Sequence, residues 1–250
     1  MDKKKDKNYF AHKNYAHRGL HDLAHGIPEN SLAAFRAAAE AGYGVELDVQ
    51  LSKDGKVVVF HDDDLKRVCG MEGYVRDYDY ADLKKMRLLG TEETIPLFSD
   101  VLRALEAGPA DLVCELKTCE KKDELCGKTL ALLETYRGKY CVESFDPFIV
   151  SWFRKNSPGT VRGLLSMSAE GFRGQNFGPV KAALLGNCTL AVLCRPDFIA
   201  YKNQDRSKKL LRRCRRHERL LFAWTSRIPD VDQGQNDAVI FEGYRPTATY

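Results

Sequence analysis

The sequence lacks any uninterrupted run of about 18 apolar residues, so it predicts no segment that spans a bilayer. It also lacks an early apolar stretch of the kind found in secretory signals. Its eight cysteines include no Cys-x-x-Cys pair and no clustered His–Cys spacing, which argues against a zinc site. A chain of 250 residues needs no disulfides to be stable, so we expect a reducing compartment and predict a cytoplasmic protein.

Domain linkers and internal repeats are absent as well. No Pro/Gly/Ser-rich stretch and no fixed-period repeat divides the chain. The length lies within the range of single-domain α/β barrels. We therefore predict a frayed basic N-terminal segment over residues 1–12 and one domain over residues 13–250.

The excess of positive charge is small, at +4, and gathers at two places, residues 3–5 and 208–219. In the second place, basic residues alternate with Leu210, Leu211 and Cys214, which is typical of a helix with an apolar inner stripe and a solvated outer face. This interpretation is favoured over a nucleic-acid or membrane site, so we predict no nucleic-acid partner. Peripheral membrane contact and the oligomeric state stay open.

Short apolar runs alternate with helical patterns along the chain, which favours βα units and a parallel sheet. One helix is expected to open at Asn30 or Ser31, and another to span residues 96–105. Nine strands are predicted. The first ends at His17, and the other eight cover residues 45–51, 57–60, 112–117, 140–144, 161–165, 198–201, 220–224 and 238–241. A closed parallel barrel needs eight. We therefore expect two adjacent early strands to be continuous, or one strand to be marginal.

Charged residues recur at the ends of these strands, where a parallel barrel carries its functional groups. Glu46 and Asp48 are two apart on one strand, so their side chains share a face, and Glu115 and Lys117 repeat this geometry. Taken alone, an E-x-D pair on a strand is more often a solvated face. Together, three carboxylates from two strands suit a hard cation such as Mg²⁺ or Ca²⁺. Lys117 is then placed to hold a phosphate.

Two histidines follow predicted strands near the same end. A single histidine in such a place is more often a hydrogen-bonded structural residue than a catalyst. Because imidazole titrates near neutrality, however, His17 and His61 beside a metal site could act as an acid/base pair. His12, His21 and His25 are expected to be surface residues without a role.

At this point the sequence resembles glycerophosphodiester phosphodiesterases. The resemblance rests on AHRGLHDLAHGIPENSLAAFRAAAEAGYGVELDVQLSKDGKVVVFHDDDLKRVCG over residues 16–70, then CELK, ESFDP and AWT at residues 114–117, 143–147 and 223–225. It implies a parallel (β/α)8 TIM-type barrel, one divalent cation and hydrolysis of small glycerophosphodiesters to glycerol 3-phosphate and an alcohol. Carried over by position, it implies these site residues: Glu46, Asp48 and Glu115 as metal ligands, His17 and His61 as the acid/base pair, Arg18 and Lys117 as phosphate contacts, and Trp224 in the pocket wall.

Two stretches depart from the family pattern. Residues 166–187 match it weakly, and the segment after Thr225 is short, with Glu242 near the place where an aspartate is expected. These departures leave two alternatives open. One is a lysophospholipase D on the same scaffold, and the other is a barrel that binds phosphodiesters without catalysis.

Overall fold

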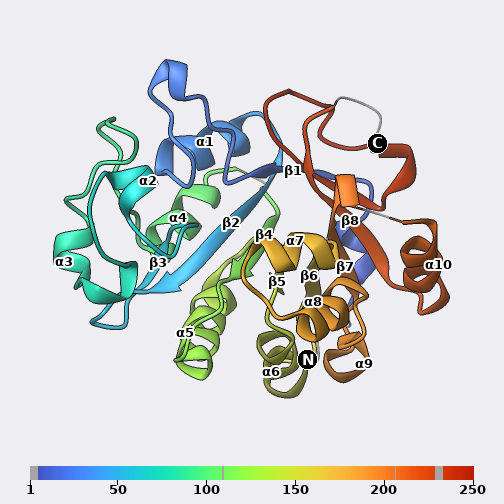
Figure 1. Ribbon diagram of the computed structural model, residues 1–250. Coiled ribbons are helices and arrows are strands. Elements are labelled where there is room, and N and C mark those ends of the chain that lie inside the picture. The colour runs from blue at the N-terminus through green and yellow to red at the C-terminus, as the bar shows by residue number, and fades with distance from the viewer. Residues whose placement is uncertain (1–4, 109, 206, 229–232) are drawn as a thin grey trace. The chain divides into compact units, whose positions relative to one another are not determined.

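The computed structural model describes residues 5–108, 110–205, 207–228 and 233–250. These residues fall into two compact units. The first-half unit is Tyr15–Tyr140, and the second-half unit combines Met1–Asn14 with Cys141–Tyr250. Strands and helices alternate along the chain in both units, as the sequence predicts (Figure 1).

The strands of the first-half unit are β1 (Asn14–His17), β2 (Gly44–Leu51), β3 (Val57–Val59) and β4 (Leu112–Leu116). β2 pairs in parallel with β1 and with β4. β3 pairs antiparallel with β2, with Val49 opposite Val59. The short connection over residues 52–56 explains this, because a hairpin joins only antiparallel strands. The four strands predicted for this part of the chain are all present, and β3, separate from β2 and antiparallel to it, is the one outside the parallel set.

Helices cover these strands. They are η2 (Leu23–His25), α1 (Leu32–Glu40), α2 (Lys66–Cys69), η3 (Val75–Asp77), α3 (Tyr80–Leu83), α4 (Phe98–Leu105) and α5 (Lys122–Thr135). α1 begins after Ser31, whose hydroxyl accepts a hydrogen bond from the backbone N–H of Ala34. α2 and α3 lie beside β3 (Figure 1), and Leu65, Val68 and Leu83 are buried in one cluster with Val58 and Phe60. This cluster fixes the loop after β3.

The second-half unit contains five strands in parallel register and in chain order, β5 to β9. The strands are β5 (Tyr140–Ser144), β6 (Val161–Ser166), β7 (Phe198–Lys202), β8 (Leu220–Ser226) and β9 (Ala238–Phe241). The helices are η1 (Lys7–Phe10), α6 (Pro147–Asn156), α7 (Ala169–Gly174), α8 (Pro179–Gly186), α9 (Ala191–Cys194), η4 (Asn203–Asp205), α10 (Lys208–Arg216) and η5 (Gln233–Gln235). With the parallel strands of the first-half unit, the described residues contain eight parallel strands.

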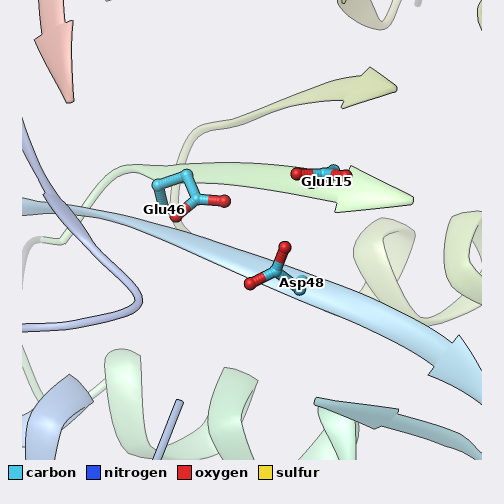
Figure 2. Close-up of side chains that lie close together, drawn as sticks. All are labelled: Glu46, Asp48 and Glu115. Atoms are coloured by element: carbon cyan, nitrogen blue, oxygen red, sulfur yellow. The ribbon is translucent and has the colours of Figure 1, made fainter. Parts of the chain in front are cut away.

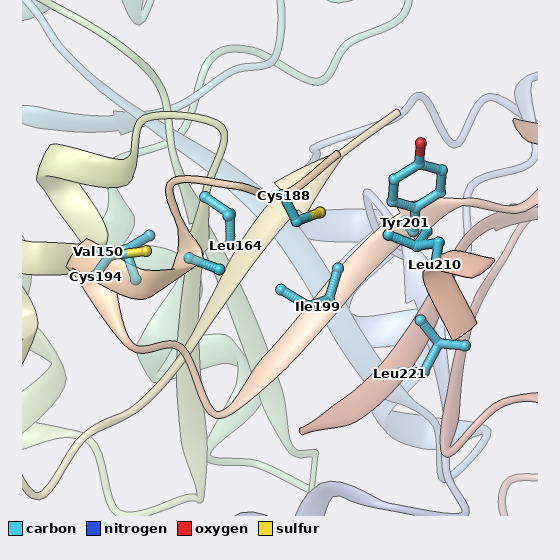
Figure 3. Close-up of a cluster of buried hydrophobic side chains, with 9 residues drawn as sticks. Val150, Leu164, Cys188, Cys194, Ile199, Tyr201, Leu210 and Leu221 are labelled. Carbon is cyan, nitrogen blue, oxygen red and sulfur yellow. The ribbon is translucent and has the colours of Figure 1, made fainter. Parts of the chain in front are cut away.

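A buried apolar cluster joins the sheet of the second-half unit to its helices. Leu164, Ile199 and Leu221 come from β6, β7 and β8 and meet Val150 of α6 and Leu210 of α10 (Figure 3). The predicted apolar stripe of the basic helix is thus confirmed at Leu210, which is buried. Burial of such aliphatic side chains contributes about 1.5–3 kcal/mol each.

Gly163 on β6 offers a test of this packing. A Cβ at Gly163 would lie 2.1 Å from the ring of Phe198, which is fully buried and stacked on Phe222. The ring cannot move away without disturbing its neighbours, so we expect Gly163→Ala to lower the free energy of unfolding by about 1–3 kcal/mol. Urea denaturation measures the change.

Gly127 is the matched control, because it lies inside α5 and a Cβ there would meet nothing within 4 Å. Alanine favours the helix over glycine by about 0.5–1 kcal/mol, so Gly127→Ala should stabilise the protein. If both substitutions had the same sign of effect, the packing assigned to Gly163 would be wrong.

Other expectations concern the chain as a whole. Within the described residues no helix is both long and apolar enough to cross a membrane. The seven cysteines whose surroundings are described form no disulfide with one another. Of the predicted N-terminal segment, residues 1–4 lie outside the described residues, and η1 follows with Phe10 buried. The boundary at residue 13 stays a prediction.

Candidate metal and catalytic site

Three carboxyl groups converge between β2 and β4. Asp48 lies directly opposite Glu115 in the parallel register of these strands, and Glu46 precedes Asp48 by two residues on the same face. One oxygen from each of the three side chains lies within 4.8 Å of the others, and all three residues are buried (Figure 2). The sequence predicts this set of carboxylates, and the structure brings it together.

Lys117 lies against two of these carboxylates. Its Nζ is 2.9 Å from Glu115 Oε1 and 3.3 Å from Asp48 Oδ1. Burial lowers the pKa of the Lys117 amine, but the Glu115 and Asp48 carboxylates outweigh burial and raise that pKa above its ordinary value. The lysine is therefore a fixed positive charge inside the cluster.

The two carboxyl groups that share Lys117 differ in acidity. At Asp48, burial favours the protonated form, but the nearby Lys117, His61 and Arg18 side chains outweigh it and hold the pKa well below its usual range. At Glu115, burial dominates over the attraction of Lys117, and the nearby Asp48 charge adds to it, so the pKa is raised. Glu115 is thus the carboxyl that takes up a proton first as the pH falls.

Arg18 contacts the cluster through both its backbone and its side chain. It has a positive φ of 56°, followed by Gly19 at 83°, and in this turn the backbone N–H of Arg18 donates to Glu46 Oε2 at 3.1 Å. Its Nε lies 3.8 Å from Asp48 Oδ2 and is buried without a hydrogen-bond acceptor among the described residues. A guanidinium with a buried unused N–H beside the cluster can donate a hydrogen bond to a further anionic group.

The two predicted histidines belong to the same unit as the carboxylates. His17 Nε2 is 4.0 Å from Glu46 Oε2. His61 contributes to the low pKa of Asp48. Its Nδ1 lies 2.6 Å from Asp62 Oδ1, and because an ionised carboxylate only accepts hydrogen bonds, Nδ1 must carry the proton. The other nitrogen, Nε2, is then left to exchange a proton with a ligand.

The structure adds residues that the sequence analysis did not single out. The amide of Asn30, which is buried, donates to Asp48 Oδ2 at 2.9 Å. Glu29 accepts from Arg18 NH1 at 2.6 Å, and Asp62 and Arg67 form further ion pairs nearby. Their signal in the sequence is polar residues in the loops that follow β1 and β3, but such residues are ordinary in loops.

Trp224 and Glu242 lie in the second-half unit. The indole N–H of Trp224, on β8, donates to the carbonyl of Ala200 at 3.0 Å, and its ring packs edge-on against Phe145 at 5.5 Å between centroids. Glu242, which stands near the position expected for an aspartate, forms an ion pair with Arg227 at 3.1 Å. A substrate contact by Trp224 stays a prediction.

The donor set of the cluster fits a hard divalent cation. It offers carboxylate oxygens alone, without sulfur or imidazole in the group of three, and Mg²⁺ and Ca²⁺ prefer oxygen ligands. Three buried carboxylates also outnumber the two cations beside them, Lys117 and Arg18, and the excess negative charge suits a bound cation. Both the geometry and the charge of this site therefore suit such an ion.

Lys117→Met tests the electrostatic account of the metal-free cluster. Methionine has a similar length but no charge, so Asp48 and Glu115 would be left buried without their shared cation. We expect a loss of about 3 kcal/mol in the free energy of unfolding at pH 8, measured by urea denaturation with a chelator present. The loss should shrink towards pH 5. Without Lys117, burial raises the folded-state pKa of the two carboxyl groups, so they take up protons in the folded variant as the pH falls and no longer carry an unpaired buried charge.

Lys128→Met is the control for this variant. Lys128 pairs with Glu124 one helical turn away, on the exposed face of α5. An exposed pair of this kind contributes about 0–1 kcal/mol. Equal losses for the two variants would contradict a buried charge cluster at Lys117.

Several curated proteins with related sequences are glycerophosphodiester phosphodiesterases. The chain is 44% identical over 97 residues to a glycerophosphodiester phosphodiesterase of Bacillus altitudinis, covering 36% of this chain and 38% of that protein. It is 28% identical over 220 residues to a putative glycerophosphodiester phosphodiesterase, YhdW, of Bacillus subtilis, covering 84% of each. Over the first three curated relatives, the matched part spans only 28–39% of their length.

A solved structure shows the fold. The chain resembles a phosphodiesterase of Oleispira antarctica, solved with the product sn-glycerol-3-phosphate, at a TM-score of 0.76 and 23% identity, covering 94% of both chains. Together with the eight parallel strands, this likeness confirms the predicted parallel (β/α)8 TIM-type barrel.

The glycerophosphoryl diester phosphodiesterase family model matches residues 17–240. This range contains every predicted site residue. It also includes residues 166–187 and, up to residue 240, the segment after Thr225, the two stretches that depart from the family pattern. The chain therefore belongs to the glycerophosphoryl diester phosphodiesterase family.

Proposed function

We propose that this protein is a metal-dependent enzyme that hydrolyses small glycerophosphodiesters to glycerol 3-phosphate and an alcohol. The observation that carries the proposal is the convergence of the Glu46, Asp48 and Glu115 carboxylates within 4.8 Å in a member of this family. The Oleispira antarctica relative in fold, solved with sn-glycerol-3-phosphate as its product, supports the substrate class.

Glu46, Asp48 and Glu115 would hold one divalent cation, and Mg²⁺ and Ca²⁺ both suit their oxygen donors. When bound, such an ion offsets charge on phosphoryl oxygens and lowers the pKa of a hydroxyl that it contacts. Arg18 and Lys117 would offset the remaining phosphate charge. Because Lys117 already contacts Asp48 and Glu115, it would have to turn part of its ammonium towards the phosphate.

Proton transfer is assigned to His17 and His61. One imidazole would deprotonate the nucleophile and the other would protonate the leaving alkoxide. The hydrogen bond between His61 Nδ1 and Asp62 supports this role, because it leaves the other ring nitrogen, Nε2, to exchange a proton. Trp224 would line the pocket. The nucleophile is the neighbouring glycerol hydroxyl or water, and only the first route passes through a cyclic phosphate, which ³¹P NMR of a single turnover would reveal.

Release of glycerol 3-phosphate from glycerophosphocholine tests the proposal. We expect turnover to stop when a chelator is added and to return with Mg²⁺ or Ca²⁺. Turnover that the chelator leaves unchanged would contradict metal dependence. Binding of glycerophosphocholine without turnover at saturating metal would instead indicate a barrel that has lost catalysis.

Lysophosphatidylcholine provides the comparison substrate. A lysophospholipase D would release choline from it faster than from glycerophosphocholine, whereas the proposed function predicts the opposite order. We also propose a cytoplasmic location, in line with seven described cysteines that form no disulfide with one another.

A further inference from the structure

Arg67, on helix α2, bridges two carboxylates that lie far apart in the sequence. Its Nε and NH2 donate to Asp62 Oδ2 and Oδ1 at 2.6 and 2.9 Å. Its NH1 and NH2 donate to Glu29 Oε2 and Oε1 at 2.9 and 2.7 Å. One guanidinium therefore makes four hydrogen bonds, and its planar fork fixes both carboxylates in position and orientation.

Each of these carboxylates holds one of the proposed catalytic or phosphate-binding groups. Asp62 Oδ1 accepts from His61 Nδ1 at 2.6 Å, and Glu29 Oε1 accepts from Arg18 NH1 at 2.6 Å. A continuous chain of charge-assisted hydrogen bonds thus runs from His61 through Asp62, Arg67 and Glu29 to Arg18. Arg67 is its central member.

The chain is anchored on a rigid part of the fold. Asp62 and Glu29 have side chains only 19% and 14% exposed, so their charges are partly removed from water and depend on their partners. Leu65 and Val68 flank Arg67 in sequence and are buried in the cluster against β3. The backbone of α2 therefore sets the place of the guanidinium.

We propose that Arg67 is a positioning residue that sets His61 and Arg18 at a fixed distance and orientation from one another. This proposal rests on the proposed function. Through Asp62 it keeps the Nδ1–H form of His61, which leaves Nε2 for proton transfer. Through Glu29 it directs the Arg18 side chain towards Asp48 and an incoming phosphodiester. Arg67 itself touches neither substrate nor reacting atoms.

The test compares Arg67→Gln and Arg67→Lys with wild type in steady-state hydrolysis of glycerophosphocholine at saturating metal. We expect kcat to fall about 10- to 100-fold, since loss of a residue that orients a ligating or catalytic group has effects of this size. Lysine keeps the charge but cannot form the fork, so it should not restore kcat. Arg87→Gln, which removes an exposed arginine paired with Glu92, is the control and should leave kcat unchanged.

A variant cycle separates positioning from a general structural effect. In the Glu29→Gln/Asp62→Asn background, Arg67 has lost the groups through which it acts, so Arg67→Gln should cost at most about 2-fold more. An unchanged kcat in Arg67→Gln, or a loss of the same size in that background, would overturn the proposal.

A second measurement does not depend on turnover. The ¹⁵N shifts of the His61 ring, assigned with His61→Gln, report which nitrogen carries the proton in the metal-free protein. We expect the Nδ1–H form in wild type and a growing share of the Nε2–H form in Arg67→Gln. If wild type released no glycerol 3-phosphate, the proposed function would fail. The change from the Nδ1–H to the Nε2–H form in Arg67→Gln would still support the positioning of His61 by Arg67. If that change did not occur, the positioning role would be overturned.

Discussion

His61→Ala is expected to lower kcat for glycerophosphocholine hydrolysis by about 100-fold or more, because general acid–base catalysis contributes about 10²–10⁴-fold. His61 Nδ1 shares a hydrogen bond of 2.6 Å with Asp62, so in the neutral ring Nε2 carries the lone pair that can take a proton. Alanine removes that group and leaves the metal ligands in place. His17→Ala should cause a loss of similar size if the two imidazoles divide the proton work.

The matched control is His25→Ala. His25 also pairs with an aspartate, Asp22, at 2.8 Å, but its side chain is 77% exposed in the loop after β1. Its removal should leave kcat within about 2-fold of wild type, as for most surface changes away from a site. Near wild-type rates for both His17→Ala and His61→Ala would refute the acid/base assignment. Rates are to be measured at saturating substrate and metal, so that kcat is separated from binding.

Local patterns account for what the sequence predicts correctly. The alternation along β2 places Glu46 and Asp48 on one face whatever the partner strand is, because the side-chain period of a strand is two. The same holds for Glu115 and Lys117 at the end of β4. Parallel pairing of these strands then brings Asp48 opposite Glu115. The strand period and the predicted parallel sheet are therefore together sufficient to predict that the three carboxylates lie close to one another.

Partners far apart in the sequence account for what was missed. Arg67 and Glu29 are 38 residues apart, and their contact depends on how the loops after β1 and β3 fold, which no local period encodes. The antiparallel pairing of β3 was missed for a related reason, since a run of three valines reads as a strand in either direction. The helix start predicted at Asn30 or Ser31 is confirmed at Ser31, the N-cap of α1. The hydrogen bond from Asn30, which has a left-handed backbone with φ at 53°, to Asp48 was not predicted.

Lys117 has a contact in the structure that its predicted role did not include. The sequence predicts it as a phosphate contact, and the structure places its amine on two of the three carboxylates. In the metal-free protein this amine supplies part of the positive charge that a cation would otherwise supply. A cation that enters the cluster must therefore compete with Lys117 for Asp48 and Glu115. Substitution of the third carboxylate, Glu46, leaves both of these partners of Lys117 in place.

Glu46→Gln should lower kcat/KM at a fixed low concentration of Mg²⁺ or Ca²⁺ by about 1,000-fold, corresponding to about 4 kcal/mol of lost charge stabilisation. Glutamine keeps the shape of the side chain and an oxygen that can still accept from the backbone N–H of Arg18. The pairs of Lys117 with Asp48 and Glu115 stay intact. The substitution therefore removes one charged ligand with little change elsewhere, and folding should be preserved.

Metal binding can be measured without activity. A cation that binds only the folded state raises the unfolding midpoint by mass action, so wild type should melt at a higher temperature with Mg²⁺ or Ca²⁺ than with a chelator. Glu46→Gln should lose most of that rise. Glu93→Gln is the control, because Glu93 also accepts a backbone N–H, from Ala33 at 3.2 Å, but lies outside the three-carboxylate cluster. An undiminished rise in Glu46→Gln would mean that the ion binds elsewhere, and the three carboxylates would then need another explanation.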